Sequence, residues 1–129
     1  MTAHFIFYVA DQGRSEAFYA QTLAVAPHLS VPGMTEFVLG DGAFLGLMPS
    51  AGIRALLGEA LPDPASAAGV PRAELYLRVA DADVCHQRAL SAGAVELSPL
   101  EERGWGDRAA YSLDPDGHVL VFAEVIAKG

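Results

Sequence analysis

The sequence predicts an α+β fold of two tandem βαβββ modules, in which a curved mixed sheet surrounds a pocket and the helices lie on the outside. The tripeptide Val-Ala-Asp joins a strand-like segment to a helix-like one at positions 9–11, and does so again at positions 79–81. A glycine turn occurs at Gly42 and recurs at Gly117, with a similar offset between the two halves. Both halves read as strand, helix and three strands, which is an internal repeat.

In the first half, residues 4–9 are aromatic and β-branched, as strands are. Asp11 suits the N-cap of a helix over residues 12–24, which ends before Pro27. The last of three following strands is apolar on both faces and is expected in the middle of its sheet. These strands are predicted at residues 28–31, 34–39 and 43–48.

The second half repeats the order after a linker. Residues 51–71 hold three prolines and three glycines, with one helical turn at 53–57. The following elements are predicted as a strand at 73–79, a helix at 81–92 and strands at 94–98, 108–113 and 118–125. The chain is therefore one domain, 1–129, with half-repeats 1–50 and 72–127. A ferredoxin-like fold would need a second helix earlier in the chain.

Composition excludes several classes of function. The net charge is −8 and the eight basic residues are scattered, which argues against nucleic-acid binding. No apolar run is long enough for a transmembrane helix, so no membrane-spanning segment is expected. The N-terminus lacks the basic region of a signal peptide, which predicts a cytoplasmic protein. Cys85 is the only cysteine and is expected to be a buried, inert thiol.

Motifs at both ends of the chain resemble a known family. The opening residues 4–11, the segment 15–19 and Leu23 resemble the first module of vicinal-oxygen-chelate proteins, the glyoxalase/bleomycin-resistance/dioxygenase superfamily. Residues 105–108 and 114–118 resemble the second module. The resemblance covers nearly the whole chain and implies the glyoxalase/bleomycin-resistance fold. The family includes lyases, dioxygenases, epimerases and metal-free drug-binding proteins, so the fold leaves the function open.

The resemblance also implies four metal-ligand positions, on the first and last strand of each module. They fall on His4, Gly46, Glu74 and Val121. Only His4 and Glu74 carry donor atoms, whereas a catalytic metal normally has at least three protein ligands. We therefore expect no cofactor, or at most a weakly held divalent metal. His28, His118 and Glu124 are candidate substitutes, although His118 reads as a solvated strand start and strand parity turns Glu124 to the opposite face.

Strand parity also predicts a ligand pocket between the two modules. Its expected lining is His4, Tyr8, Met48, Glu74, Tyr76, Arg78 and Trp105. Glu74 and Arg78 stand about 13 Å apart on one strand, which leaves water or a ligand as their expected partners, and a cationic or amphoteric aromatic ligand would suit Glu74. Trp105 lies on a glycine-flanked loop that closes over this pocket or plugs the core. The alternate residues are expected under the helices: Phe5, Phe7, Leu45, Leu75, Leu77, Leu120 and Phe122.

Three functions fit these features. The first is a small-molecule binding or sequestering protein with a degenerate metal site. The second is a metal-dependent lyase or isomerase of the glyoxalase type with an incomplete or rearranged ligand set, so the sequence leaves open whether the protein is an enzyme. The third is a regulatory or structural domain with a vestigial pocket. Ring-cleaving dioxygenase chemistry is disfavoured because Val121 occupies a ligand position. The apolar strand 43–48 favours a homodimer.

Overall fold

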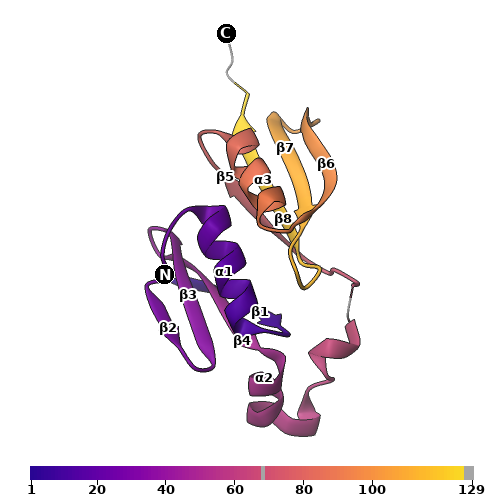
Figure 1. The fold of residues 1–129 in the computed structure, drawn as a ribbon. Coiled ribbons are helices and arrows are strands. Elements are labelled where there is room, and N and C mark those ends of the chain that lie inside the picture. Colours follow the sequence, from indigo (N-terminus) through magenta and orange to yellow (C-terminus); the bar gives the residue numbers. More distant parts are fainter. Residues whose placement is uncertain (68, 127–129) are drawn as a thin grey trace.

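The computed structural model describes residues 1–67 and 69–126, and it contains the two predicted modules (Figure 1). The order of elements in each half is strand, helix and three strands, which confirms the predicted α+β class. The first module comprises β1 (Ala3–Val9), α1 (Gln12–Leu23), β2 (Leu29–Val31), β3 (Met34–Gly40) and β4 (Ala43–Pro49). The second comprises β5 (Glu74–Arg78), α3 (Ala82–Ser91), β6 (Val95–Glu102), β7 (Asp107–Leu113) and β8 (Val119–Val125).

The segment between the modules contains more helix than the sequence predicted. Helix α2 spans Ser50–Leu57 and continues into the 3₁₀ turn η1 (Gly58–Ala60), and a second 3₁₀ turn, η2 (Pro64–Ala67), follows three residues later. Ile53 is the one buried residue of α2 and anchors the helix to the domain. Gly58 follows the helix with a φ of 58°, a conformation that glycine adopts without strain. The prolines and glycines of this segment therefore bound short helices within it.

Each module forms its own four-stranded mixed sheet. The strand orders are β1-β4-β3-β2 and β5-β8-β7-β6, and the first two strands of each sheet are parallel. Strand β4 lies between β1 and β3, as its two apolar faces predicted. In the pairing, His4 lies opposite Phe44, Ile6 opposite Gly46, and Gly46 opposite Glu36. This register fixes which side chains share a face.

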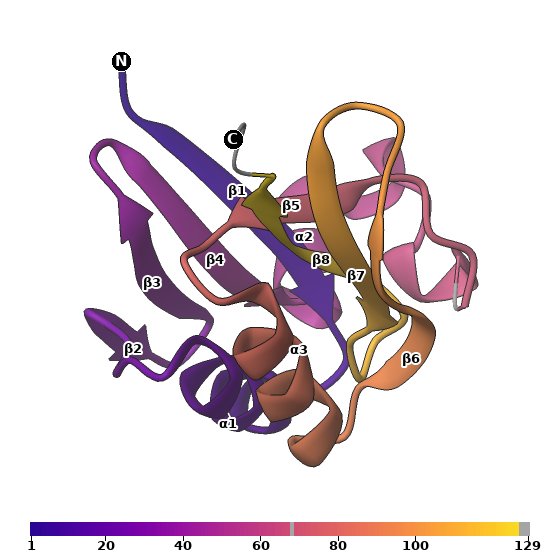
Figure 2. The same cartoon turned by 90° about the horizontal axis from the view of Figure 1, so that it is seen from above.

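One hydrophobic core serves both modules. Helices α1 and α3 contact each other and lie side by side, with the two sheets spread to either side of them (Figure 2). The core joins buried residues of both sheets and both helices, including Tyr19, Phe37, Leu75, Cys85 and Phe122. We call the opposite face of each sheet, which is turned away from the helices, its outer face.

The prediction that Phe5 belongs to this core is wrong, because its side chain is 54% exposed. Strand β1 is an edge strand, and α1 lies over β3 and β4 instead. The other predicted core residues are buried or pack against the core.

Polar contacts also join the modules at the turn between β7 and β8. The buried hydroxyl of Tyr19 donates to Asp114 at 2.6 Å, and Ser15 and the amide of Ala10 donate to Asp116. His118 stacks on Phe7 with ring centroids 4.2 Å apart, and its Nε2 lies 3.0 Å from the carbonyl oxygen of Tyr8. His118 is thus half-buried in the contact between modules, contrary to its prediction as a solvated strand start.

Both long helices begin at aspartates in equivalent positions of the repeat. Asp11 accepts from the amide of Arg14 at 2.9 Å, and Asp81 accepts from the amide of Val84 at 3.1 Å. Helix α1 ends at Leu23, one residue before the predicted end at Ala24, and Ala24 caps it with a left-handed φ of 56°. In the described residues, no helix is both long and apolar enough to cross a membrane.

Removing either helix cap should weaken the fold modestly. We expect Asp11→Ala and Asp81→Ala each to lower the free energy of unfolding by about 1 kcal/mol, since each leaves a first-turn amide without its acceptor. Urea unfolding at neutral pH measures the change. Asp41→Ala, at an exposed turn residue, is the control and should change little. Equal effects at all three positions would contradict the assignment of the caps.

Candidate functional site

The residues predicted for the ligand pocket lie on the outer faces of both sheets. His4, Tyr8 and Met48 belong to β1 and β4 of the first sheet. Glu74, Tyr76 and Arg78 lie on β5 of the second sheet, and Trp105 lies between β6 and β7. In the part of the chain that the structure describes, no hydrogen bond or ion pair links one of these sets to the other. The candidate residues therefore fall into two half-sites, one on each sheet.

On the first outer face, two histidines gather around one carboxylate. His28 Nε2 lies 2.8 Å from Glu36 Oε1, and His4 Nδ1 lies 3.4 Å from Glu36 Oε2. The ring of His4 stacks on Phe44 with centroids 4.7 Å apart. Sequence reasoning missed Glu36, although it is the only charged residue of the strand predicted at 34–39, and the register places it opposite the family position Gly46. The carboxylate thus faces two histidines and completes a polar cluster within a largely apolar face.

Two of the four family positions do not fit a metal ion. A Cβ atom added to Gly46 would lie 3.1 Å from Ile6 Cγ1 and 3.2 Å from Met34 Sδ, so neighbouring side chains fill the space of a ligand there. Val121 is fully buried beside Ala109 and Ala123. Glu124 accepts from the amide of Ala82 at the start of α3 and so lies on the helix side, as parity indicated. Among the described residues, no three His, Cys, Asp or Glu side chains form a group that could hold a metal.

The second outer face is organised around Asp107, a buried carboxylate that sequence reasoning also missed. Its Oδ2 accepts from the Tyr76 hydroxyl at 2.5 Å and from Arg78 Nε at 3.0 Å. The expectation that only water or a ligand partners Arg78 is therefore wrong. Arg78 pairs with Ala123 on β8, which in turn pairs with Ala109 on β7. These small side chains leave room for the arginine to reach from β5 across β8 to β7.

The tyrosine hydroxyl also receives a hydrogen bond from the loop before β7. Trp105 Nε1 donates to the Tyr76 oxygen at 2.9 Å, while the indole remains 57% exposed. The loop tryptophan therefore does not plug the core. Glu74 is exposed. Burial is the main cause that raises the pKa of the Tyr111 hydroxyl, and the negative charge of Glu74 raises this pKa further. The guanidinium of Arg103 lies 5.1 Å from the centre of the Tyr111 ring. This face thus combines aromatic rings with charges of both signs.

The ion pair between Asp107 and Arg78 should persist at acidic pH. The hydrogen bond from Tyr76, followed by that from Arg78, holds the pKa of Asp107 below its ordinary value of 3.8, against the effect of burial. A carboxyl group whose pKa is lowered on folding stabilises the protein at pH values above its pKa in the unfolded chain. This contribution is lost as the pH falls through its pKa in the folded protein. We therefore expect Asp107→Asn to be less stable than the wild type at pH 7.

This difference should shrink as the pH falls below 3.8, the ordinary value for the unfolded chain. Urea unfolding of both proteins between pH 7 and pH 3 measures the gap. Asp41→Asn, at an exposed turn residue, should show little difference at any pH. A gap for Asp107→Asn that stays constant down to pH 3 would contradict the ionised pair.

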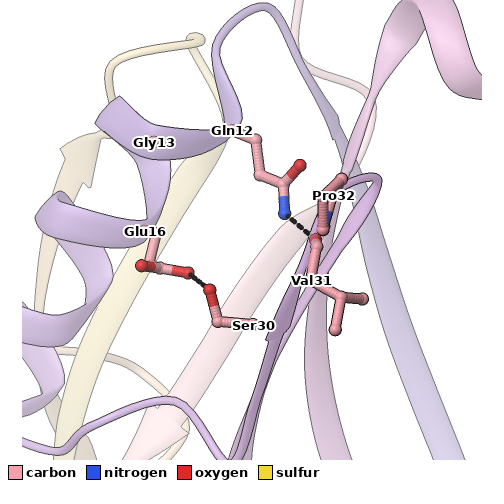
Figure 3. Close-up of a pocket in the computed structure, with 6 residues that line it drawn as sticks. All are labelled: Gln12, Gly13, Glu16, Ser30, Val31 and Pro32. Atoms are coloured by element: carbon pink, nitrogen blue, oxygen red, sulfur yellow. Dashed lines mark hydrogen bonds between the residues drawn. The ribbon is translucent and has the colours of Figure 1, made fainter.

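Two hollows in the surface lie away from most of the predicted residues. The first, of about 270 Å³, lies between the start of α1 and the β2–β3 hairpin (Figure 3). Its polar groups bond to each other, because Gln12 donates to the carbonyl of Val31 at 2.8 Å and Glu16 accepts from Ser30 at 2.5 Å. These hydrogen bonds therefore hold the β2–β3 hairpin against the start of α1. The second, of about 240 Å³, lies between the modules and includes Leu39, Leu77, Arg78 and Cys85 in its lining.

Comparison with known proteins agrees with this architecture. Curated relatives include an uncharacterized protein of Mycobacterium bovis, 46% identical over 55 residues, a match that covers 43% of this chain and 36% of that protein. The matched region is thus about a third of the relative's length. Among solved structures, a glyoxalase-related enzyme from Fulvimarina pelagi superposes with a TM-score of 0.81 at 22% identity, covering 96% of this chain and 87% of its own.

A glyoxalase/bleomycin resistance protein/dioxygenase family enzyme from Burkholderia phytofirmans gives a TM-score of 0.80 at 19% identity, covering 95% and 97% of the two chains. At these identities the structures support the fold alone. The sequence model of the Glyoxalase/Bleomycin resistance protein/Dioxygenase superfamily matches residues 2–122, nearly the whole chain. With its two βαβββ modules and their mixed sheets, the chain belongs to this superfamily.

Proposed function

We propose that the protein binds a small organic molecule without a catalytic metal, in a pocket formed between two copies of the chain. The observation that carries this proposal is the composition of the first outer face. Large apolar and aromatic side chains remain between 36% and 49% exposed there: Ile6, Tyr8, Leu29, Val31 and Val38. A contiguous apolar face of this kind is typical of a binding or subunit surface.

A homodimer accounts for the division of the site into two half-sites. In a twofold dimer, the first outer face of one protomer can meet the second outer face of its partner, and symmetry then gives two identical pockets. Each pocket would combine His4, Tyr8 and Met48 of one protomer with a second set of side chains from its partner. The residues of this second set are Glu74, Tyr76, Arg78 and Trp105, contributed by the other copy of the chain. Apolar walls with a few polar groups suit an organic ligand.

A pair of glutamate substitutions tests the proposal. Val38→Glu places a charge on the first outer face, whereas Leu56→Glu places one on α2, where the leucine is 71% exposed. We expect the wild type and Leu56→Glu to be dimers by light scattering at tens of micromolar and to bind the probe 8-anilino-1-naphthalenesulfonate. Val38→Glu should remain folded by circular dichroism, be a monomer by light scattering, and bind the probe at least tenfold more weakly. A wild-type monomer that binds no probe would overturn the proposal.

The second candidate is a metal-dependent lyase or isomerase of the glyoxalase type. The specific observation in its favour is the cluster of His4, His28 and Glu36, which supplies a rearranged set of donors. It ranks second because each oxygen of Glu36 already faces one histidine, and among the described residues these three side chains do not form a group that could hold a metal. About one zinc, nickel or iron ion per chain after dialysis, lost in His28→Ala, would favour this candidate over the first.

A further inference from the structure

The second outer face carries two exposed recognition groups that are held in place from below. The two groups are joined by a continuous chain of hydrogen bonds. Trp105 Nε1 donates to the Tyr76 hydroxyl, and both that hydroxyl and Arg78 Nε donate to Asp107 Oδ2. Asp107 is almost completely buried, with 3% of its side chain exposed. At the two ends of the chain, the indole is 57% exposed and the arginine side chain 62% exposed.

The direction of the arginine decides which donors remain available. Asp107 engages only Nε, and among the described residues the two terminal nitrogens of Arg78 donate no hydrogen bond to the protein. The guanidinium therefore presents its outer pair of N–H groups to solvent, in the planar arrangement that matches a carboxylate with two parallel hydrogen bonds. The buried Asp107 fixes the direction of this fork before any ligand arrives, which lowers the entropy lost on binding.

The exposed indole adds a second feature of the ligand. Trp105 follows Gly104 and precedes Gly106, whose φ is 93°, so the backbone of this loop is bent while the hydrogen bond to Tyr76 fixes the ring. A fixed, exposed indole provides a flat apolar surface on which another ring can stack. The Tyr76 ring lies beside the guanidinium, with its centre 6.0 Å from Arg78 Cζ.

From this arrangement we infer that the site selects an aromatic carboxylate, whose carboxylate pairs with the terminal nitrogens of Arg78 and whose ring stacks on Trp105. The inference rests on the proposed small-molecule binding and names the class of ligand. It replaces the cationic or amphoteric ligand that Glu74 suggested from the sequence, because Asp107 holds Arg78 in place, whereas among the described residues no hydrogen bond or ion pair holds Glu74. The selectivity is local, since the net charge of −8 repels anions from the protein as a whole.

Three matched probes test this selectivity: benzoate, benzamide and benzylammonium. Trp105 is the only tryptophan, so one indole N–H signal in an ¹⁵N-correlated NMR spectrum reports binding beside it. We expect benzoate to shift this signal with an affinity about tenfold higher than that of benzamide, and benzylammonium to bind more weakly still. Arg78→Gln should remove the preference for benzoate, and Arg78→Lys should retain part of it, because lysine keeps the charge without the planar fork.

Arg14→Gln is the matched control. Arg14 is also an exposed arginine beside an aspartate, with 52% of its side chain exposed and Asp116 at 3.4 Å, but it lies at the start of α1. Its substitution should leave the benzoate preference unchanged, and thermal unfolding confirms that each variant is folded. Equal affinities for benzoate and benzamide, or a preference that survives Arg78→Gln, would overturn the inference and leave the proposed function standing. If no probe shifts the indole signal, the inference is overturned, and failure of the dimer test separately overturns the proposed function.

Discussion

Replacing Asp114 by alanine is expected to lower the free energy of unfolding by about 3 kcal/mol and the melting temperature by about 10 °C. This nearly buried carboxylate accepts from the Tyr19 hydroxyl at 2.6 Å and from the amides of Asp116 and His118 at 2.8 and 2.9 Å. Alanine would leave all three donors without this acceptor, and the hydroxyl of Tyr19 is fully buried. The loss affects both the β7–β8 turn and its contact with α1.

Thermal and urea unfolding at neutral pH measure this effect, with the exposed Asp41→Ala as control. Tyr19→Phe should show a smaller loss, because it removes one of the three hydrogen bonds. It should also change the response to alkali. Burial, and then the Asp114 charge, raise the pKa of Tyr19 well above its ordinary value of 10.0. The wild type should therefore lose stability as the pH rises above 10.0, where unfolded Tyr19 ionises and folded Tyr19 does not.

Tyr19→Phe should lose less stability than the wild type over that range. If the two proteins respond to alkali equally, or if Asp114→Ala is as stable as the control, the buried hydrogen bonds do not hold the modules as described.

Replacing Phe122 by alanine should cost about 3–5 kcal/mol, the range for truncating a buried aromatic side chain. Phe122 lies on the central strand β8 with 1% of its side chain exposed, in the core that both modules share. Its removal should therefore weaken both modules together, and we expect a single unfolding transition at a lower urea concentration.

Phe5→Ala is the matched control, because it removes the same side chain from an edge strand where 54% of it is exposed. The change there should stay below about 1 kcal/mol. Circular dichroism and tyrosine fluorescence should report the same midpoint for each protein. Two separate transitions in Phe122→Ala, or equal losses in the two variants, would contradict a shared core.

The repeat made most of the fold predictable from the sequence. A strand, a capping aspartate and a glycine turn recur at fixed offsets, and these signals are local in the chain, so periodicity and turn chemistry reveal them. The same local reasoning assigned Leu45 and Leu120 to the core. It failed for Phe5, because the exposure of that residue depends on where α1 crosses the sheet.

The candidate site was less predictable because its key contacts cross strands. Asp107 and Arg78 belong to strands that are far apart in the sequence, and so do Glu36 and His4. Parity along one strand gives the face of a residue but not its neighbour on the next strand, which depends on register and bulges. The pairing of β3 with β4 shifts between Val38 and Gly40, so the turn alone does not fix Glu36 opposite Gly46.

The shared core also bears on what the covalent connection between the modules contributes. Most of residues 58–73 are exposed, and among those that the structure describes none contributes to the buried core. A peptide bond broken there would leave the contacts between α1 and α3, and between Tyr19 and Asp114, intact. The two pieces would then behave as subunits of a tight heterodimer. The linker chiefly raises the effective concentration of one module around the other.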